Sequence, residues 1–259
     1  MRQIISALLL AAVAATTQAE VQEQAVTYDH DGTTLNGFLY FDDAIEGKRP
    51  GVLVFDEWWG LTDYGKRRAR MLAEEGYVAF IGDMYGEGKT AETAAQAREL
   101  MQGITADVDG WRERAGLALE QLKSSELTDS ERIAAIGYCF GGGTILQLAY
   151  DGADLKGIVG FHSALPAAPE ESKGQIAPRI MILLGQQDSF VTPEVIGNFR
   201  DKLDAAGADW ELVVYGGVRH GFTNPGADKR GIENIKYDAV ADTRSWARTQ
   251  AFLEEVLAP

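Results

Sequence analysis

The chain has 259 residues, of which 46% are hydrophobic and 24% are charged; this is the composition of an ordinary globular protein and excludes a fibrous or disordered one. Its formal net charge of −15 argues against binding to nucleic acid and against an electrostatic grip on anionic lipid. Because an acidic chain does not attract acidic substrates, any anion site must be local.

Residues 1–19 have the pattern of a secretory signal peptide. Arg2 precedes an apolar segment over residues 4–15, and Thr17, Gln18 and Ala19 resemble a cleavage site with small residues. The apolar segment is too short to cross a bilayer. We therefore expect a periplasmic or secreted protein whose mature chain, residues 20–259, forms one domain without a membrane span.

The mature chain alternates between apolar strands and amphipathic helices. Strands are predicted at residues 26–28, 34–41, 51–55, 77–81, 133–136, 155–161, 178–184 and 210–215. Helices are predicted at residues 63–75, 91–102, 108–122, 144–150, 193–206 and 237–257. The first two strands form a hairpin whose turn contains His30, which we predict to be a solvated surface residue. The alternation predicts an α/β fold, a mostly parallel, twisted sheet with helices on both faces.

A sharp turn separates the strand at 133–136 from the helix that follows. Gly137 and Gly141 flank Cys139, and a turn of the form Gly-x-nucleophile-x-Gly needs both glycines because the strained central residue leaves no room for a neighbouring Cβ. The helix N-terminus beside Cys139 favours a thiolate. Cys139 is the only cysteine, so in an exported chain it has no disulfide partner and is available for chemistry. The alternative is a small hydrophobic residue in a glycine-rich turn.

Three further polar residues follow the ends of predicted strands. In an open α/β sheet functional groups gather beyond the carboxyl ends of the strands, which makes Glu57, Asp188 and His220 candidates together with Cys139. The order nucleophile, acid, histidine is the order of α/β-hydrolases. It predicts Cys139 as nucleophile, His220 as its base and Asp188 as the partner that orients His220. Alternatively, Asp188 closes an Asx turn and His220 is a surface loop residue.

The groups around this nucleophile suggest an oxyanion hole and an apolar cleft. The main-chain N–H groups of Phe140 and Trp58 are predicted to stabilise the oxyanion. Substrate-binding residues are predicted at Trp59, Tyr85, His162 and Phe222. The sequence contains no metal-ligand spacing, dinucleotide fingerprint or phosphate loop, so we expect no metal and no cofactor.

Five short motifs give the chain its resemblance to the dienelactone hydrolase family, a branch of the α/β-hydrolases. They lie at residues 56–60, 83–86, 137–142, 185–188 and 220–222, and the resemblance extends over about residues 28–257. It implies an eight-stranded sheet and hydrolysis of an ester or lactone through a Cys-Asp-His triad.

Glu57 matches the family's glutamate near the thiol. The resemblance implies that this carboxyl group keeps the resting cysteine neutral until substrate displaces it, and like-charge repulsion with a thiolate agrees with that role. Alternatively, Glu57 caps a helix or only supports the site.

Two residues depart from the family pattern. Glu87 and Asn224 stand where members that cleave dienelactone have carboxylate-binding arginines, so we expect neutral acyl or aryl esters as substrates. Arg219 and Arg230 are the possible substitutes. Because the arginines are missing, two alternative functions stay open: a ligand-binding or thiol-sensing protein on the same fold, and an acyl transferase. We expect a monomer or a homodimer.

Overall fold

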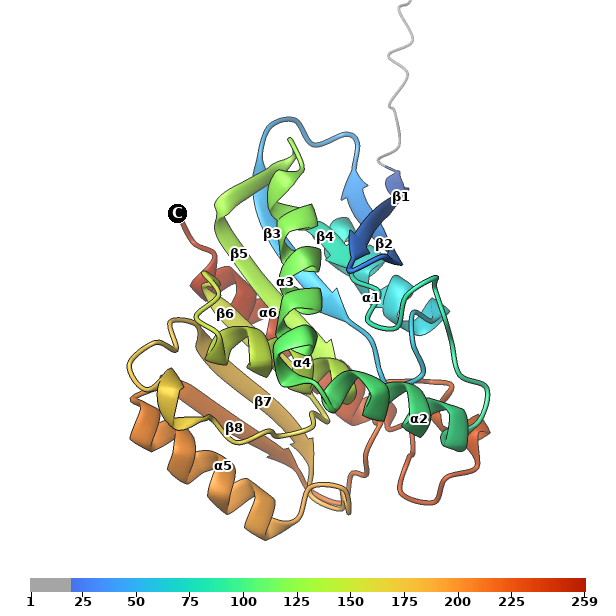
Figure 1. Cartoon of the computed structure of the whole chain (residues 1–259), viewed down its shortest axis with the longest axis vertical. Coiled ribbons are helices and arrows are strands. Elements are labelled where there is room, and N and C mark those ends of the chain that lie inside the picture. Colours follow the sequence, from blue (N-terminus) through green and yellow to red (C-terminus); the bar gives the residue numbers. More distant parts are fainter. Residues whose placement is uncertain (1–19) are drawn as a thin grey trace, which may run out of the picture.

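The computed structural model describes residues 20–259 and is organised around one eight-stranded sheet (Figure 1). The strand order is β1-β2-β4-β3-β5-β6-β7-β8. The strands are β1 Val21–His30, β2 Thr33–Asp42, β3 Arg49–Phe55, β4 Val78–Ile81, β5 Thr128–Tyr138, β6 Gly157–Phe161, β7 Arg179–Gly185 and β8 Trp210–Tyr215. The hairpin β1-β2 is antiparallel and joins β4 in an antiparallel pairing, whereas every other pairing is parallel. The predicted signal peptide lies outside the described residues.

Helices cover both faces of this sheet (Figure 1). They are α1 Asp63–Glu74, α2 Ala94–Thr105, α3 Val108–Ser124, α4 Phe140–Tyr150, α5 Pro193–Ala206 and α6 Ala239–Val256, with short 3-10 helices at Glu170–Ser172 and Ala227–Arg230. Helices α3, α4 and α5 pack in one core layer, and α1 and α6 pack in the other. The predicted α/β-hydrolase architecture, with helices on both faces of a mostly parallel sheet, is confirmed.

The apolar strands supply both core layers because successive side chains point to opposite faces. In β3, Leu53 and Phe55 enter the layer under α3 and α4, whereas Val52 and Val54 enter the layer under α1 and α6. All four side chains are fully buried. The carboxyl ends of these strands therefore meet at one edge, where the loops carry polar residues.

Polar residues define the ends of the helices that border this edge. The side chain of Thr93 accepts from the Gln96 N–H at the start of α2, and the Gln96 side chain returns the contact, which is a capping box. Thr192 caps α5, and Gly207 ends that helix with a φ of 74°.

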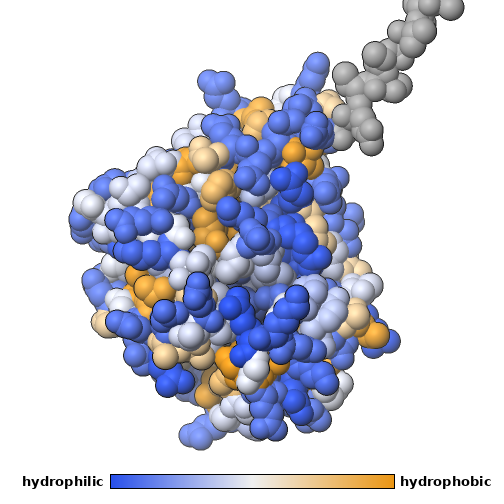
Figure 2. All heavy atoms as spheres, turned by 90° about the vertical axis from the view of Figure 1, so that its right-hand side faces the viewer, coloured by the Kyte–Doolittle hydropathy of each residue, from blue (hydrophilic) through white to orange (hydrophobic). Residues whose placement is uncertain are grey.

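The outer surface is mostly hydrophilic on the face shown in Figure 2, in keeping with the charge of the chain. None of the helices within residues 20–259 is both long and apolar enough to cross a membrane.

Several elements extend beyond their predicted bounds, among them β1, which spans Val21–His30 instead of residues 26–28. Strand β5 begins at Thr128, since its first residues pair with Arg49 and Pro50 before a register shift at Gly51. Helix α4 begins at Phe140 directly after the turn, so residues 141–143, which precede the predicted helix start at residue 144, form its first turn. The prediction that His30 is solvated was wrong. Its side chain is only 13% exposed, because the hairpin turn packs against α3.

Candidate active site

The turn between β5 and α4 holds Cys139 at a positive φ of 52° with ψ −112°, a strained conformation for a residue other than glycine. A Cβ at Gly137 would lie 2.2 Å from the Gly141 carbonyl oxygen, and a Cβ at Gly141 would lie 2.2 Å from that of Phe55. No side chain fits at either position, so the two glycines permit the turn. The turn leaves Cys139 partly exposed at the N-cap position of α4.

His220 is oriented by a carboxylate behind it. Its Nδ1 lies 2.6 Å from Oδ2 of Asp188, and both side chains are almost fully buried. The other oxygen, Oδ1, accepts hydrogen bonds from the Phe190 N–H at 2.9 Å and from Nδ2 of Asn234 at 3.3 Å. With three contacts the carboxylate is fixed, and it selects the tautomer in which Nδ1 carries a proton. Sequence reasoning did not find Asn234, because no motif marks it.

The electrostatic surroundings of His220 favour its charged form. Burial lowers its pKa, but the neighbouring Cys139 and the hydrogen-bonded Asp188 outweigh burial and raise the pKa to about 10. His220 and Cys139 both line the same cavity, where the imidazole can act on the thiol.

A cavity of about 370 Å³ opens over this pair. It is lined by Trp58, Arg98, Met101, Cys139, Ser163, Ala164, Leu165, Phe190, Val191, Val195, His220 and Ile235. Most of these side chains are apolar, and Phe190 is 52% exposed. The cavity suits the apolar portion of a small ester, with the thiol and imidazole at its wall.

Four residues predicted to bind substrate do not line this cavity. Trp59, Tyr85, His162 and Phe222 are all buried. Tyr85 stacks on Phe140 at 5.8 Å between ring centroids and donates a hydrogen bond from its hydroxyl to the Trp58 carbonyl at 2.9 Å. The four side chains thus belong to the packed interior around the site. The cavity wall combines Trp58, Cys139 and His220, which the motifs marked, with residues such as Arg98 and Phe190, which they did not.

The predicted oxyanion donors lie at the ends of β3 and β5. Within residues 20–259, neither the Phe140 N–H nor the Trp58 N–H has a hydrogen-bond partner in the protein. The chain at this point is held by a hydrogen bond of 3.1 Å from the Gly141 N–H to the Asp56 carbonyl. This contact brings the end of β3 next to the start of α4, which is the arrangement that an oxyanion hole needs.

Glu57 lies beside the loop that carries His220. It is 5% exposed, and its Oε2 accepts a hydrogen bond of 2.7 Å from Nδ2 of Asn224. Burial, followed by repulsion from Asp56, raises the Glu57 pKa to about 7, against lowering contributions from Asn224 and His220. Asn224 is therefore a direct partner of Glu57. With a pKa of about 7, the Glu57 carboxyl group is partly protonated at neutral pH.

The charged residues named at the family's arginine positions or as their substitutes lie away from the cavity wall. The Glu87 side chain is 66% exposed and pairs with Lys89 at 3.0 Å. Arg219 donates to the Glu233 carbonyl at 2.7 Å, and the Arg230 guanidinium lies 3.9 Å from the ring centroid of Trp59.

Arg98 on α2 is an exposed residue that lines the cavity. Within residues 20–259 its side chain has no ion-pair or hydrogen-bond partner. Its guanidinium is the one permanent charge among the lining residues.

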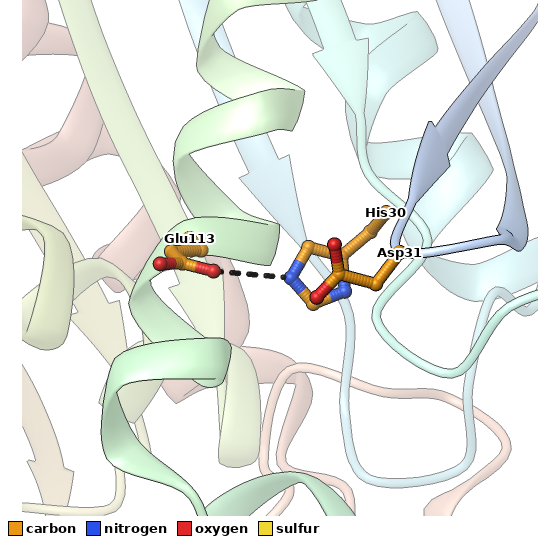
Figure 3. Close-up of side chains that lie close together, drawn as sticks. All are labelled: His30, Asp31 and Glu113. Carbon is orange, nitrogen blue, oxygen red and sulfur yellow. Dashed lines mark ion pairs between the residues drawn. The ribbon is translucent and has the colours of Figure 1, made fainter.

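Among the described residues, one group has the donor set of a metal site. His30, Asp31 and Glu113 place their ligand atoms within 4.8 Å of one another (Figure 3). However, Arg114 lies 3.1 Å from Nδ1 of His30 and can only donate, so Nε2 carries the proton and faces Glu113 at 3.5 Å. The guanidinium and this tautomer oppose a cation, and the group instead fastens the β1-β2 turn to α3.

The sheet order, the nucleophile turn and the Asp188–His220 pair together define an α/β-hydrolase. The chain belongs to the dienelactone hydrolase family, whose model matches residues 35–257. It is a carboxylic ester or lactone hydrolase.

Individual relatives cover nearly the whole chain. Protein usf of Aquifex pyrophilus is 30% identical over 90% of this chain and 99% of its own. Two solved structures are each 36% identical. A dienelactone hydrolase-like promiscuous phosphotriesterase, P91, from metagenomic libraries has a TM-score of 0.90 and covers 93% of this chain and 100% of its own. The structure entitled m3DLH has a TM-score of 0.89 and covers 92% and 99%.

Proposed function

We propose that this chain hydrolyses small carboxylic esters or lactones through Cys139, His220 and Asp188, with a thioester on Cys139 as intermediate. The observation that carries the proposal is the buried 2.6 Å contact between Asp188 and His220 beside a partly exposed Cys139 at a cavity wall. A histidine held in one tautomer next to a thiol is the minimum machinery for nucleophilic catalysis.

In the acylation step the Cys139 thiolate attacks the ester carbonyl carbon, and the carbonyl electron pair moves onto oxygen. In this proposal the N–H groups of Phe140 and Trp58 donate to this oxyanion. When the tetrahedral intermediate collapses, the carbon–oxygen bond to the alcohol breaks, and protonated His220 gives its Nε2 proton to the leaving alkoxide. The products are an alcohol and an acyl thioester on Cys139.

In the deacylation step neutral His220 removes a proton from water, and the hydroxide attacks the thioester. The carbon–sulfur bond breaks and the acid leaves, which regenerates the Cys139 thiolate while the proton taken from water remains on His220. Glu57 has a pKa raised to about 7, so near neutral pH it takes up or releases a proton without a large cost. In its neutral form it does not repel the thiolate.

The cavity supports esters whose acyl and alcohol portions are small and apolar. Phosphotriesters are a second substrate class, supported by the 36% identity to a promiscuous phosphotriesterase. The same thiolate would attack phosphorus and expel an aryl oxide.

We also propose that residues 1–19 direct export and are removed, since they combine a basic residue, a short apolar segment and small residues before Glu20. The N-terminal sequence of the protein purified from a periplasmic extract tests this, and retention of residues 1–19 would refute it.

Steady-state hydrolysis tests the activity itself. We expect the mature enzyme to release p-nitrophenol from p-nitrophenyl acetate and the Cys139→Ala variant to show only background release. A dienelactone assayed beside it tests the expectation that an anionic lactone is a poor substrate. Full activity in Cys139→Ala would exclude the thiol mechanism.

A further inference from the structure

We infer that Thr223 is a positioning residue that clamps the loop carrying His220 and Asn224. The clamp sets the rate of the chemical step while contacting no substrate itself. This inference rests on the proposed function, because it assigns the clamp a role in placing the base of Cys139. Thr223 is fully buried and is absent from the lining of the cavity.

Thr223 is held on three sides. Its Oγ1 lies 2.6 Å from the Tyr64 hydroxyl and 2.8 Å from Nε2 of His162. Its carbonyl oxygen accepts a hydrogen bond of 2.7 Å from Arg68. Tyr64 and Arg68 are four residues apart on α1 and thus lie on one helix face, so α1 grips both the side chain and the main chain of Thr223.

The anchors of this clamp are themselves fixed. Arg68 is 2% exposed and forms an ion pair with Asp242, which lies in the first turn of α6. His162 is fully buried directly after β6, where its N–H donates to the Leu183 carbonyl at 2.8 Å. A φ of 37° at His162 is uncommon for a residue other than glycine and persists where the surroundings hold it. The clamp therefore ties the loop to three separate elements.

Thr223 lies between the two residues of this loop that adjoin the proposed chemistry. His220 lies three residues before it, and its ring meets the ring of His162 edge to face with 4.9 Å between centroids. Asn224 follows it directly and donates to Glu57. Because a displacement of about 1 Å in a reacting group costs up to about 100-fold in rate, release of the clamp should slow the reaction more than it loosens substrate binding.

The hydroxyl group alone can be removed to test the clamp. Thr223→Val keeps the shape and the carbonyl contact with Arg68 but loses both Oγ1 contacts, whereas Thr223→Ser keeps the hydroxyl. Thr249→Val is the matched control, because Thr249 is also fully buried and its Oγ1 donates to the Ser245 carbonyl within α6, outside the cavity. Tyr64→Phe is the second test, since it deletes one contact and keeps the ring.

For p-nitrophenyl acetate we expect Thr223→Val to lower kcat about tenfold and to change KM less than about twofold. Thr223→Ser should recover kcat to within about threefold, and Tyr64→Phe should lower it about threefold. Thr249→Val, which loses one buried hydrogen bond, should lose about 2–4 °C in Tm and keep wild-type kcat, whereas Thr223→Val, which loses two buried contacts, should lose about twice as much in Tm.

The inference is overturned if Thr223→Val keeps wild-type kcat, or if its kcat falls no more than that of Thr249→Val. It is also overturned if the kcat of Thr223→Ser is as low as that of Thr223→Val. If Thr223→Val fails to fold, an unchanged kcat in Tyr64→Phe overturns the inference. A wild-type enzyme that neither hydrolyses nor is acylated by the ester would instead overturn the proposed function, and the inference with it.

Discussion

The buried carboxyl group of Glu57 makes a quantitative prediction about stability and pH. Its pKa is raised from 4.5 to about 7, with burial as the largest cause. Between these two values the folded protein holds a proton that the unfolded chain releases, so the wild-type free energy of unfolding must fall as pH rises through this interval. Glutamine keeps the size of the side chain and does not titrate. Glu57→Gln therefore removes this loss of stability.

The magnitude follows from the shift. At about 1.4 kcal/mol for each pH unit, the carboxylate costs about 3 kcal/mol once the pH is above the folded-state value. The difference in free energy of unfolding, variant minus wild type, should therefore increase by about 3 kcal/mol between pH 4.5 and pH 8.5. Urea unfolding at the two pH values, with a thiol reductant present, measures it.

Glu131→Gln is the control for this measurement. Glu131 is exposed on β5, so the same substitution there alters no buried group and gives the reference against which the Glu57→Gln difference at the two pH values is compared. The reasoning would be refuted if the free energy of unfolding of Glu57→Gln minus that of the wild type stayed constant within about 0.5 kcal/mol between the two pH values, because a buried acid with a raised pKa must change it.

Three further substitutions test the site. Gly141→Ala places a Cβ 2.2 Å from the Phe55 carbonyl oxygen, and the forced shift should lower Tm by more than about 6 °C on a thermal melt. Asp188→Asn should lower kcat by about 10³ to 10⁴ with little change in KM in ester assays, because the amide releases the tautomer of His220. Arg98→Gln should raise KM about threefold for p-nitrophenyl hemisuccinate and leave it unchanged for the butyrate, since Arg98 supplies the lining charge.

These results would each contradict a separate step. An unchanged melt for Gly141→Ala would mean that the turn tolerates a side chain. A wild-type kcat in Asp188→Asn would show that the Asp188 carboxylate has no role in the mechanism. Equal KM changes for both esters would show that the cavity does not sense the charge of Arg98.

Much of the fold could be predicted from local patterns in the sequence. Strand β8 at Trp210–Tyr215 and helix α5 at Pro193–Ala206 were predicted with the observed bounds. A strand rich in aromatic and β-branched residues, and a helix with a capping threonine, a proline and a terminal glycine, carry their signals locally. The glycine run of α4 could not be read as helix, since its support comes from close packing against Phe55 and Ser163.

The candidate site was only partly accessible from sequence. The positions of Cys139, Asp188 and His220 follow from strand ends, and the structure brings Asp188 and His220 into contact. Their catalytic roles stay predictions. Contacts such as Thr223 with Tyr64, which are 159 residues apart, have no local signature. The sequence also could not show that Trp59, Tyr85, His162 and Phe222 lie outside the cavity wall, because packing decides which side chains face a cavity.

A covalent adduct on Cys139 tests the central claim most directly. The mature enzyme is mixed with p-nitrophenyl butyrate, quenched in acid within the first turnovers, and its intact mass and peptide map are measured. The proposed mechanism predicts a butyryl group on the peptide that contains Cys139, decaying as the acid is released, and no such group in Cys139→Ala. Ester hydrolysis without an adduct on Cys139, or an adduct on another residue, would contradict it.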